Sequence, residues 1–211
     1  MPEHIGDWSI AFGCSFTEKL IKTAPQRCIR LARVFPGKGF KSYEYERKGI
    51  DIESYYSTLE RTEPKFVVIL HACAHSPTGF DPSEEQWRRM VHLMKANHPF
   101  PLLDAACLGY NSANHDDDSF AMRLFIGEMN MEAGICVSFA EYMGLYGERV
   151  GCFLPASKSN QIVMNTQSML EMLQRSEMSV PSAFTTKIAS QILGRDDWKK
   201  MWCADMTTTS G

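Results

Sequence analysis

The sequence predicts an α/β fold in which a mainly parallel β-sheet carries helices on both faces. Short apolar runs rich in β-branched residues recur along the chain, amphipathic stretches of helical period separate them, and Pro, Gly or Ser marks many of the boundaries. Strands that alternate with helices of this length favour a parallel sheet that is covered on both sides. These observations place the chain in the α/β class.

The clearest strand is the apolar run FVVILHAC at residues 66–73. It follows a break at Glu63-Pro64 and leads into the segment at 76–79, whose Pro and Gly stop a strand. We therefore expect a buried strand followed by a tight loop.

The helix after this loop is predicted to begin at Ser83. The Ser83 side chain can accept a hydrogen bond from the backbone three residues later, while Gln86 reaches back to the backbone of Ser83. Two glutamates in the first turn suit the positive end of the helix dipole. One face is expected to be buried, and its residues are Trp87, Met90, Val91 and Met94.

The remaining elements follow in order along the chain. Further strands are expected at 101–106, 134–140 and 149–155, and a helix from Asp118 to about Met129 has Phe120, Leu124 and Phe125 on its buried side. The later part is more helical, at 160–174 and from about Ser182 to Leu193. Residues 206–211 are expected to form a disordered tail.

Composition limits the class of protein. The chain has 211 residues, 44% of them hydrophobic, and a formal net charge of −3, which gives no general attraction for nucleic acid or an anionic membrane. Seven cysteines are scattered singly, with no metal-like pairing with histidine, and indicate reduced thiols of an intracellular protein. The first residues do not look like a signal or transit peptide, and no window is apolar enough to cross a bilayer. We expect a cytoplasmic protein without a bound metal.

Three segments carry a resemblance to a known family. HACAHSPTGFDPSEEQW (71–87), LLDAACLGY (102–110) and SFAEYMGLYGERVG (138–151) resemble segments of the aspartate aminotransferases, in matching order and spacing. Fainter similarity includes IAFGCSF (10–16) and the region from Arg175 to Pro181. The resemblance implies the large, cofactor-binding domain of a fold-type I transferase over residues 1–205, incomplete at both ends.

The resemblance also implies an activity. Aspartate aminotransferases use pyridoxal phosphate to move an amino group between L-aspartate and 2-oxoglutarate, giving oxaloacetate and L-glutamate. Their substrates are dicarboxylic amino acids and 2-oxo acids. Family members form dimers, so a homodimer, or a heterodimer with a full-length aminotransferase, is expected. No nucleic-acid or membrane partner is expected.

Several implied site residues are retained. Asp104 matches the carboxylate that keeps the cofactor's ring nitrogen protonated, and its alternative role is to cap the turn after a strand. Ser138 and Arg149 match phosphate ligands, although Arg149 also suits a surface ion pair. Arg175 matches the arginine that binds the substrate's side-chain carboxylate in the partner's site, and it equally suits a helix end. Gly6 falls on a glycine of the phosphate loop.

Other positions depart from the family pattern. Glu141 stands where the family has the lysine that forms the Schiff base with the cofactor, and a carboxylate cannot form that bond. The other departures are Ser76 for an asparagine and Cys107 for a tyrosine that contact the ring oxygen, Asp7 for a threonine, and Cys28 for the ring-stacking tryptophan. We expect no catalytic residue to be retained and a Glu141–Arg149 ion pair to neutralise the site.

Three hypotheses remain open from the sequence. The first is an aspartate aminotransferase-like protein that is catalytically defective. The second is a non-catalytic binding or interaction protein, which keeps weak affinity for pyridoxal phosphate or associates with an intact aminotransferase. The third is a truncated product of a longer protein.

Overall fold

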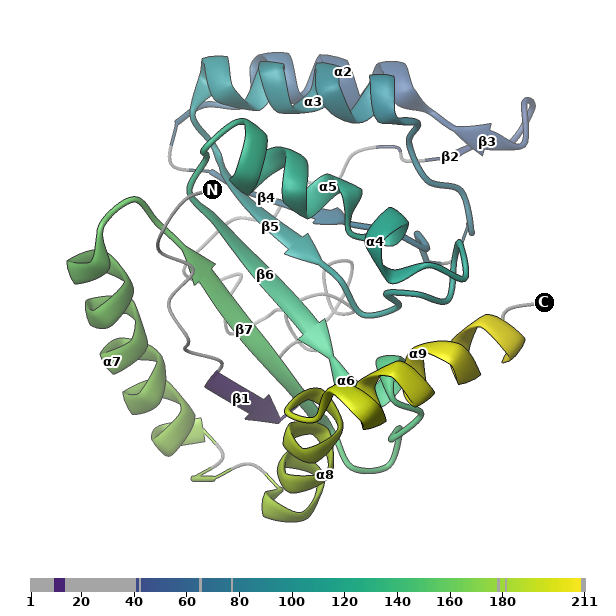
Figure 1. The fold of residues 1–211 in the computed structure, drawn as a ribbon. Helices are drawn as coiled ribbons and strands as arrows, with labels where there is room; N and C mark the ends of the chain where they lie inside the picture. Colours follow the sequence, from purple (N-terminus) through teal and green to yellow (C-terminus); the bar gives the residue numbers. More distant parts are fainter. Residues whose placement is uncertain are drawn as a thin grey trace.

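The computed structural model describes residues 10–13, 41, 43–64, 66–76, 78–177, 179–180 and 182–209. The predictions for Gly6, Asp7 and Cys28 lie outside these residues. The described part contains a five-stranded sheet in the order β1-β7-β6-β5-β4 and a small hairpin (Figure 1). The sheet strands are β1 (Ile10–Gly13), β4 (Val67–His71), β5 (Phe100–Asp104), β6 (Ala133–Ser138) and β7 (Val150–Ala156). The hairpin is formed by β2 (Tyr43–Glu44) and β3 (Gly49–Ile50).

The α/β class with helices on both sides of the sheet is confirmed, and the described sheet is mixed. β4 pairs with β5 and β5 with β6 in parallel, whereas β7 is antiparallel to both β6 and β1. Residues 139–149, which join β6 to β7, contain only the short helix α6 (Phe139–Tyr142). A parallel crossover needs about a dozen residues or more, usually with a longer helix. The short connection therefore returns β7 antiparallel to β6.

Helix α3 (Glu84–Asn97) begins as predicted at Ser83. The Ser83 hydroxyl accepts from the Gln86 backbone N–H, and the Gln86 side chain accepts from the Ser83 backbone N–H, so the capping box is complete. The predicted inward face is also confirmed, because Trp87, Met90, Val91 and Met94 are buried. Helix α2 (Ile52–Arg61) lies beside α3 (Figure 1).

The segment predicted as one helix from Asp118 to Met129 is divided into three pieces. These are α4 (His115–Asp118), α5 (Phe120–Met122) and the π-helical turn η1 (Arg123–Glu128). Leu124 and Phe125 are buried as predicted, and Phe120 is half-buried. The Asp118 carboxylate accepts a hydrogen bond from Gly109 in the loop after β5, and the helix path shifts at Ser119.

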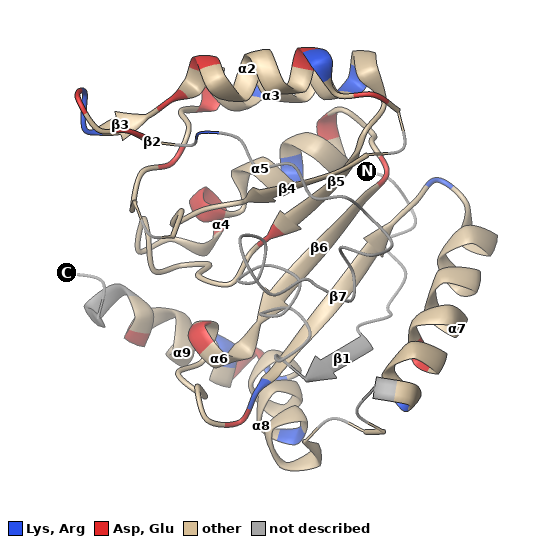
Figure 2. Cartoon of the chain, turned by 180° about the vertical axis from the view of Figure 1, so that it is seen from behind, with Lys and Arg blue, Asp and Glu red and all other residues tan. Residues whose placement is uncertain are grey.

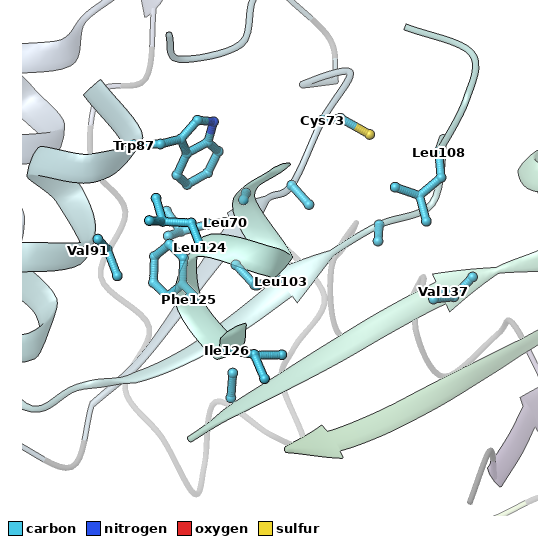
Figure 3. Close-up of a cluster of buried hydrophobic side chains, with 14 of the residues drawn as sticks. Leu70, Cys73, Trp87, Val91, Leu103, Leu108, Leu124, Phe125, Ile126 and Val137 are labelled. Atoms are coloured by element: carbon cyan, nitrogen blue, oxygen red, sulfur yellow. The ribbon is translucent and has the colours of Figure 1, made fainter. Parts of the chain in front are cut away.

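The core lies between α3, η1 and the strands β4 and β5. Trp87 and Phe125 meet edge to face with ring centroids 6.1 Å apart. Figure 3 shows Leu70, Leu103 and Leu124 gathered around this pair. These strands are therefore anchored by apolar packing, which fixes the position of their carboxyl ends.

Three helices complete the described chain: α7 (Asn160–Glu177), α8 (Ala183–Leu193) and α9 (Asp196–Thr209). Helix α9 extends into the segment predicted as a tail at 206–211, and Met206 is buried there. Met206 fits against Gly109, where a Cβ atom would lie 3.0 Å from the Met206 Cε atom. Apolar packing at Met206 and an edge-to-face contact between Trp202 and Tyr142 at 4.5 Å hold α9 in place. Among the described residues, no helix is long and apolar enough to span a membrane.

Candidate functional site

Three residues predicted for the site, Asp104, Ser138 and Arg149, lie along one edge of the sheet together with His71. His71, Asp104 and Ser138 are the last residues of the parallel strands β4, β5 and β6. β7 runs in the opposite direction, so Arg149, just before its first residue Val150, lies at the same edge. The register pairs Ser138 with Gly151, two residues beyond Arg149. The carboxyl edge of such a sheet is where α/β proteins commonly bind ligands.

Asp104 divides its two carboxylate oxygens between different partners. Oδ1 accepts a hydrogen bond from the Ala106 backbone N–H at 3.2 Å, which is the turn-capping role considered as an alternative. Oδ2 lies 3.9 Å from Nε2 of His71, and the Asp104 side chain is only 12% exposed. Asp104 is therefore held in a fixed orientation at the edge of the sheet.

His71 is a site residue that the sequence interpretation missed. Its Nδ1 accepts a hydrogen bond from the Ser76 backbone N–H at 3.0 Å, so the neutral ring carries its proton on Nε2, toward Asp104. Burial lowers the pKa of His71, while nearby Asp81 acts in the opposite direction. Both ring nitrogens face partners on the chain, so His71 positions Asp104. The signal was present in the sequence, because His71 opens the HACAH motif.

The loop after β4 is held by a second carboxylate. The two oxygens of Asp81 accept from the backbone N–H groups of Ala74 and His75 at 2.7 and 2.9 Å. The His75 ring lies tilted against His71, with centroids 4.7 Å apart. Ser76, predicted to contact the cofactor ring oxygen, has an exposed side chain in this loop. Its backbone N–H is the group that the structure places against His71.

The loop after β5 contains Cys107 and is organised by Asp118. The Asp118 carboxylate accepts from the backbone N–H groups of Gly109, Asn111 and Ser112 at 2.7, 3.1 and 3.1 Å, and its side chain is buried. Cys107 is half-buried in the turn that these bonds fix. The sequence interpretation placed Asp118 only at the start of a helix, because no local pattern indicates that backbone N–H groups six to nine residues earlier bind its carboxylate.

Ser138 and Glu141 form a direct pair at the end of β6. Ser138 precedes α6 and is 5% exposed, and its hydroxyl donates a hydrogen bond to Oε2 of Glu141 in the first turn of α6. Arg149 has a left-handed backbone (φ 55°), and its Nη1 donates to the Tyr146 carbonyl at 3.1 Å. The expected Glu141–Arg149 ion pair stays a prediction.

Arg175 lies elsewhere in the described structure. It is exposed in the last turn of α7, the helix that packs along β1 and β7. Its role as a substrate contact in a partner's site stays a prediction.

The fold and the edge site together define an α/β protein with polar groups collected at the carboxyl ends of its parallel strands. Comparison with known proteins refines this class. Residues 27–209 match the family described as aminotransferase class I and II. The chain is 32% identical to the cytoplasmic aspartate aminotransferase of Saccharomyces cerevisiae, over 94% of this chain and 50% of that protein.

Solved structures agree with this match. A putative aspartate aminotransferase from Leishmania major superposes with a TM-score of 0.83 at 27% identity, over 96% of this chain and 56% of that one. The cytoplasmic aspartate aminotransferase of S. cerevisiae gives a TM-score of 0.80 at 27% identity, over 96% of this chain and 55% of that one. The chain belongs to the class I and II aminotransferase family and is aspartate aminotransferase-like. It spans about half the length of these relatives.

Aminotransferases of this family generally use pyridoxal phosphate, so its fit to this edge can be tested on the donor groups present. Position 141 offers a carboxylate and no amine. The Ser138 hydroxyl, which the resemblance assigns to the cofactor phosphate, donates to Glu141 instead. Asp104 lies at the same edge, with its carboxylate beside Ala106 and His71, and its role toward the ring nitrogen stays a prediction. The groups around residues 138 and 141 do not fit the cofactor.

Proposed function

We propose that this chain is an aspartate aminotransferase-like protein that does not carry out the family reaction, the amino transfer between L-aspartate and 2-oxoglutarate. The observation that supports the proposal is the Ser138–Glu141 pair, in which a carboxylate accepts from the hydroxyl assigned to the cofactor phosphate. By the resemblance of residues 138–151, position 141 corresponds to the family's lysine. A carboxylate has no nitrogen with which to bond the cofactor's aldehyde. Loss of this one group removes the covalent route to amino transfer.

The activity test compares the purified chain with the cytoplasmic S. cerevisiae relative. Both are supplied with pyridoxal phosphate, L-aspartate and 2-oxoglutarate, and oxaloacetate formation is followed. We expect turnover with the relative and none above the buffer rate with this chain. Borohydride treatment followed by peptide mass spectrometry should find no cofactor attached at residue 141. Aspartate-dependent turnover by this chain, with the cofactor fixed at another lysine, would refute the proposal.

A second candidate function is association with an intact aminotransferase. Its support is the apolar surface of α7, where Ile162, Met169 and Leu173 are 49%, 66% and 48% exposed. These residues recur at helical spacing and so share one stripe of the helix, with Met172 beside it at 73% exposed. Figure 2 shows few charges on α7, in contrast to α2 and α3. Contiguous exposed apolar surface of this kind is typical of a protein contact.

We also propose a location, a domain and substrates for the whole protein. A cytoplasmic location is supported by the printed name of the S. cerevisiae relative. Residues 1–205 are proposed to form the large domain of an aminotransferase. Dicarboxylic amino acids and 2-oxo acids are the substrates of the family reaction, and Arg175 is the proposed contact in a dimer.

A further inference from the structure

We propose that the Glu141 carboxylate is an internal anion that accepts the proton of the Ser138 hydroxyl. It thereby excludes phosphate monoesters, pyridoxal phosphate among them, from this edge of the sheet. The inference rests on the proposed function and adds a physical cause. A chain that merely lacked the lysine would still bind the cofactor's phosphate. A chain whose own carboxylate is hydrogen-bonded to the Ser138 hydroxyl would not.

The first step is the hydrogen-bonding capacity of Ser138. A serine hydroxyl has one proton to donate, and here Glu141 Oε2 accepts it. A phosphate dianion has only acceptor oxygens, so it needs that same proton. Ser138 is buried, and water therefore has little access to take the place of either partner. Binding of a phosphate thus requires the Ser138–Glu141 bond to break.

The second step is that this pairing differs from an ordinary helix cap. Ser83 and Gln86 have the same spacing at the start of α3, and there the serine hydroxyl accepts from the backbone. Ser138 makes no side-chain cap bond to the backbone of α6 and donates to the Glu141 side chain instead. The Ser138–Glu141 contact is therefore a pairing of two side chains at the edge of the sheet.

The third step is charge. Glu141 brings a negative charge to the hydroxyl that would face the phosphate, and like charges a few Å apart repel. Asp104 already supplies a carboxylate at the same edge, while Arg149 supplies the cation. Neutralising Glu141 removes this repulsion beside the Ser138 hydroxyl. Removal of one carboxylate should therefore improve phosphate binding.

The experiment measures binding of inorganic phosphate and of pyridoxine 5′-phosphate by isothermal titration calorimetry. Pyridoxine 5′-phosphate has no aldehyde, so it cannot react with lysines elsewhere. The main variants are Glu141→Gln and Glu141→Ala. The matched control is Glu132→Gln, because exposed Glu132 also accepts a hydrogen bond from a serine hydroxyl, that of Ser157, at the other end of β6. Circular dichroism checks that each variant is folded.

We expect both position-141 variants to bind at least about tenfold more tightly than the natural chain or Glu132→Gln, the effect of about one hydrogen bond. The larger part of this gain should disappear in the double variant Ser138→Ala/Glu141→Gln, which keeps only the relief of charge repulsion. Equal affinity of the position-141 variants and the control, or a gain of unchanged size without the Ser138 hydroxyl, would overturn the inference.

A measurement on the natural chain alone gives a second test that does not depend on variants. Millimolar phosphate should leave its thermal unfolding midpoint unchanged relative to chloride at equal ionic strength, because a ligand that binds the native state would raise it. A rise would overturn the inference. The transamination assay is scored separately: turnover by the natural chain refutes the proposed function, whereas unchanged phosphate binding in the variants refutes only the role of Glu141.

Discussion

Asp118, the last residue of α4, binds the loop after β5 through its side chain. Its carboxylate is 4% exposed and accepts three backbone N–H groups, from residues 109, 111 and 112. Asp118→Asn would direct an amide N–H₂ toward at least one of these donors and remove the charge that strengthens the bonds. We expect the free energy of unfolding to fall by about 2 kcal/mol or more, measured by urea denaturation.

The neighbouring Asp117 is the matched control, because it carries the same group in the same helix and is exposed. Asp117→Asn should change the free energy of unfolding by about 0.5 kcal/mol or less. Equal losses in the two variants would show that charge in this acidic segment matters and that the three backbone bonds do not.

At the scale of single residues, the sequence singled out positions that lie together at one edge of the sheet, but it did not predict their partners. Ser138, Glu141 and Arg149 were singled out by the motif, but Glu141 was expected to face Arg149, and the contact described for its carboxylate is with Ser138. A hydroxyl three residues earlier comes within reach only because α6 begins directly after β6. No periodic pattern in the sequence predicts the geometry of that junction.

At the scale of elements, the strands β4 to β7 and helix α3 were predicted, whereas β1, the β2–β3 hairpin and the path around η1 were not. β4 to β6 are short apolar runs, and the Ser83–Gln86 cap has a local cause that spacing alone reveals. The division at Ser119 accompanies the hydrogen bonds that the Asp118 carboxylate accepts from the loop six to nine residues earlier. The helical end of the chain was likewise missed, because Met206 is held by contact with Gly109 and not by a local pattern.

Substitutions on helix α7 test the second candidate function, association with an intact aminotransferase. Met169→Glu/Met172→Glu places two charges on its apolar stripe, and both side chains are mostly exposed, so folding should be preserved. We expect the natural chain to co-sediment with the S. cerevisiae relative in analytical ultracentrifugation. The double variant should weaken that association by at least about tenfold, because two charges would need to be desolvated in an apolar contact.

The control for α7 lies on another helix. Met201 of α9 is 67% exposed, so Met201→Glu makes the same chemical change at a similar exposure away from α7. Association that is absent in the natural chain, or weakened equally by Met201→Glu, would count against α7 as the contact surface.

At the scale of the whole molecule, buried titratable groups set a pH range for stability. Burial lowers the pKa of His71, His75 and His115 below the ordinary value of 6.5. Asp81 opposes this shift at His71 and His75, and Asp116 and Asp118 oppose it at His115, where Lys199 reinforces it. The unfolded chain then binds more protons than the native state as the pH falls below 6.5. Stability is therefore present above that pH and is lost as the pH falls through it.

Buried cysteines set the upper limit of this pH range, because burial raises their pKa values. Burial raises the pKa of Cys136 and of Cys152 from 9.0 to about 12. Above pH 9.0 the unfolded chain loses these protons before the native state does, so the native state is disfavoured as the pH rises. Cys136 also lies near Asp104, whose charge acts in the same direction.

The free energy of unfolding should therefore be greatest between about pH 6.5 and 9.0 and fall on both sides. Urea denaturation at intervals from pH 5 to 10 measures the profile. Two variants identify the groups responsible for each limb. His115→Gln should flatten the acidic limb, and Cys152→Ala should flatten the alkaline limb. Cys152→Ala should also lower the free energy of unfolding at every pH by about 1 kcal/mol or more, since Cys152 is buried in β7. A profile that rises toward pH 5, or limbs that neither variant changes, would show that burial of these groups does not govern the stability of the fold.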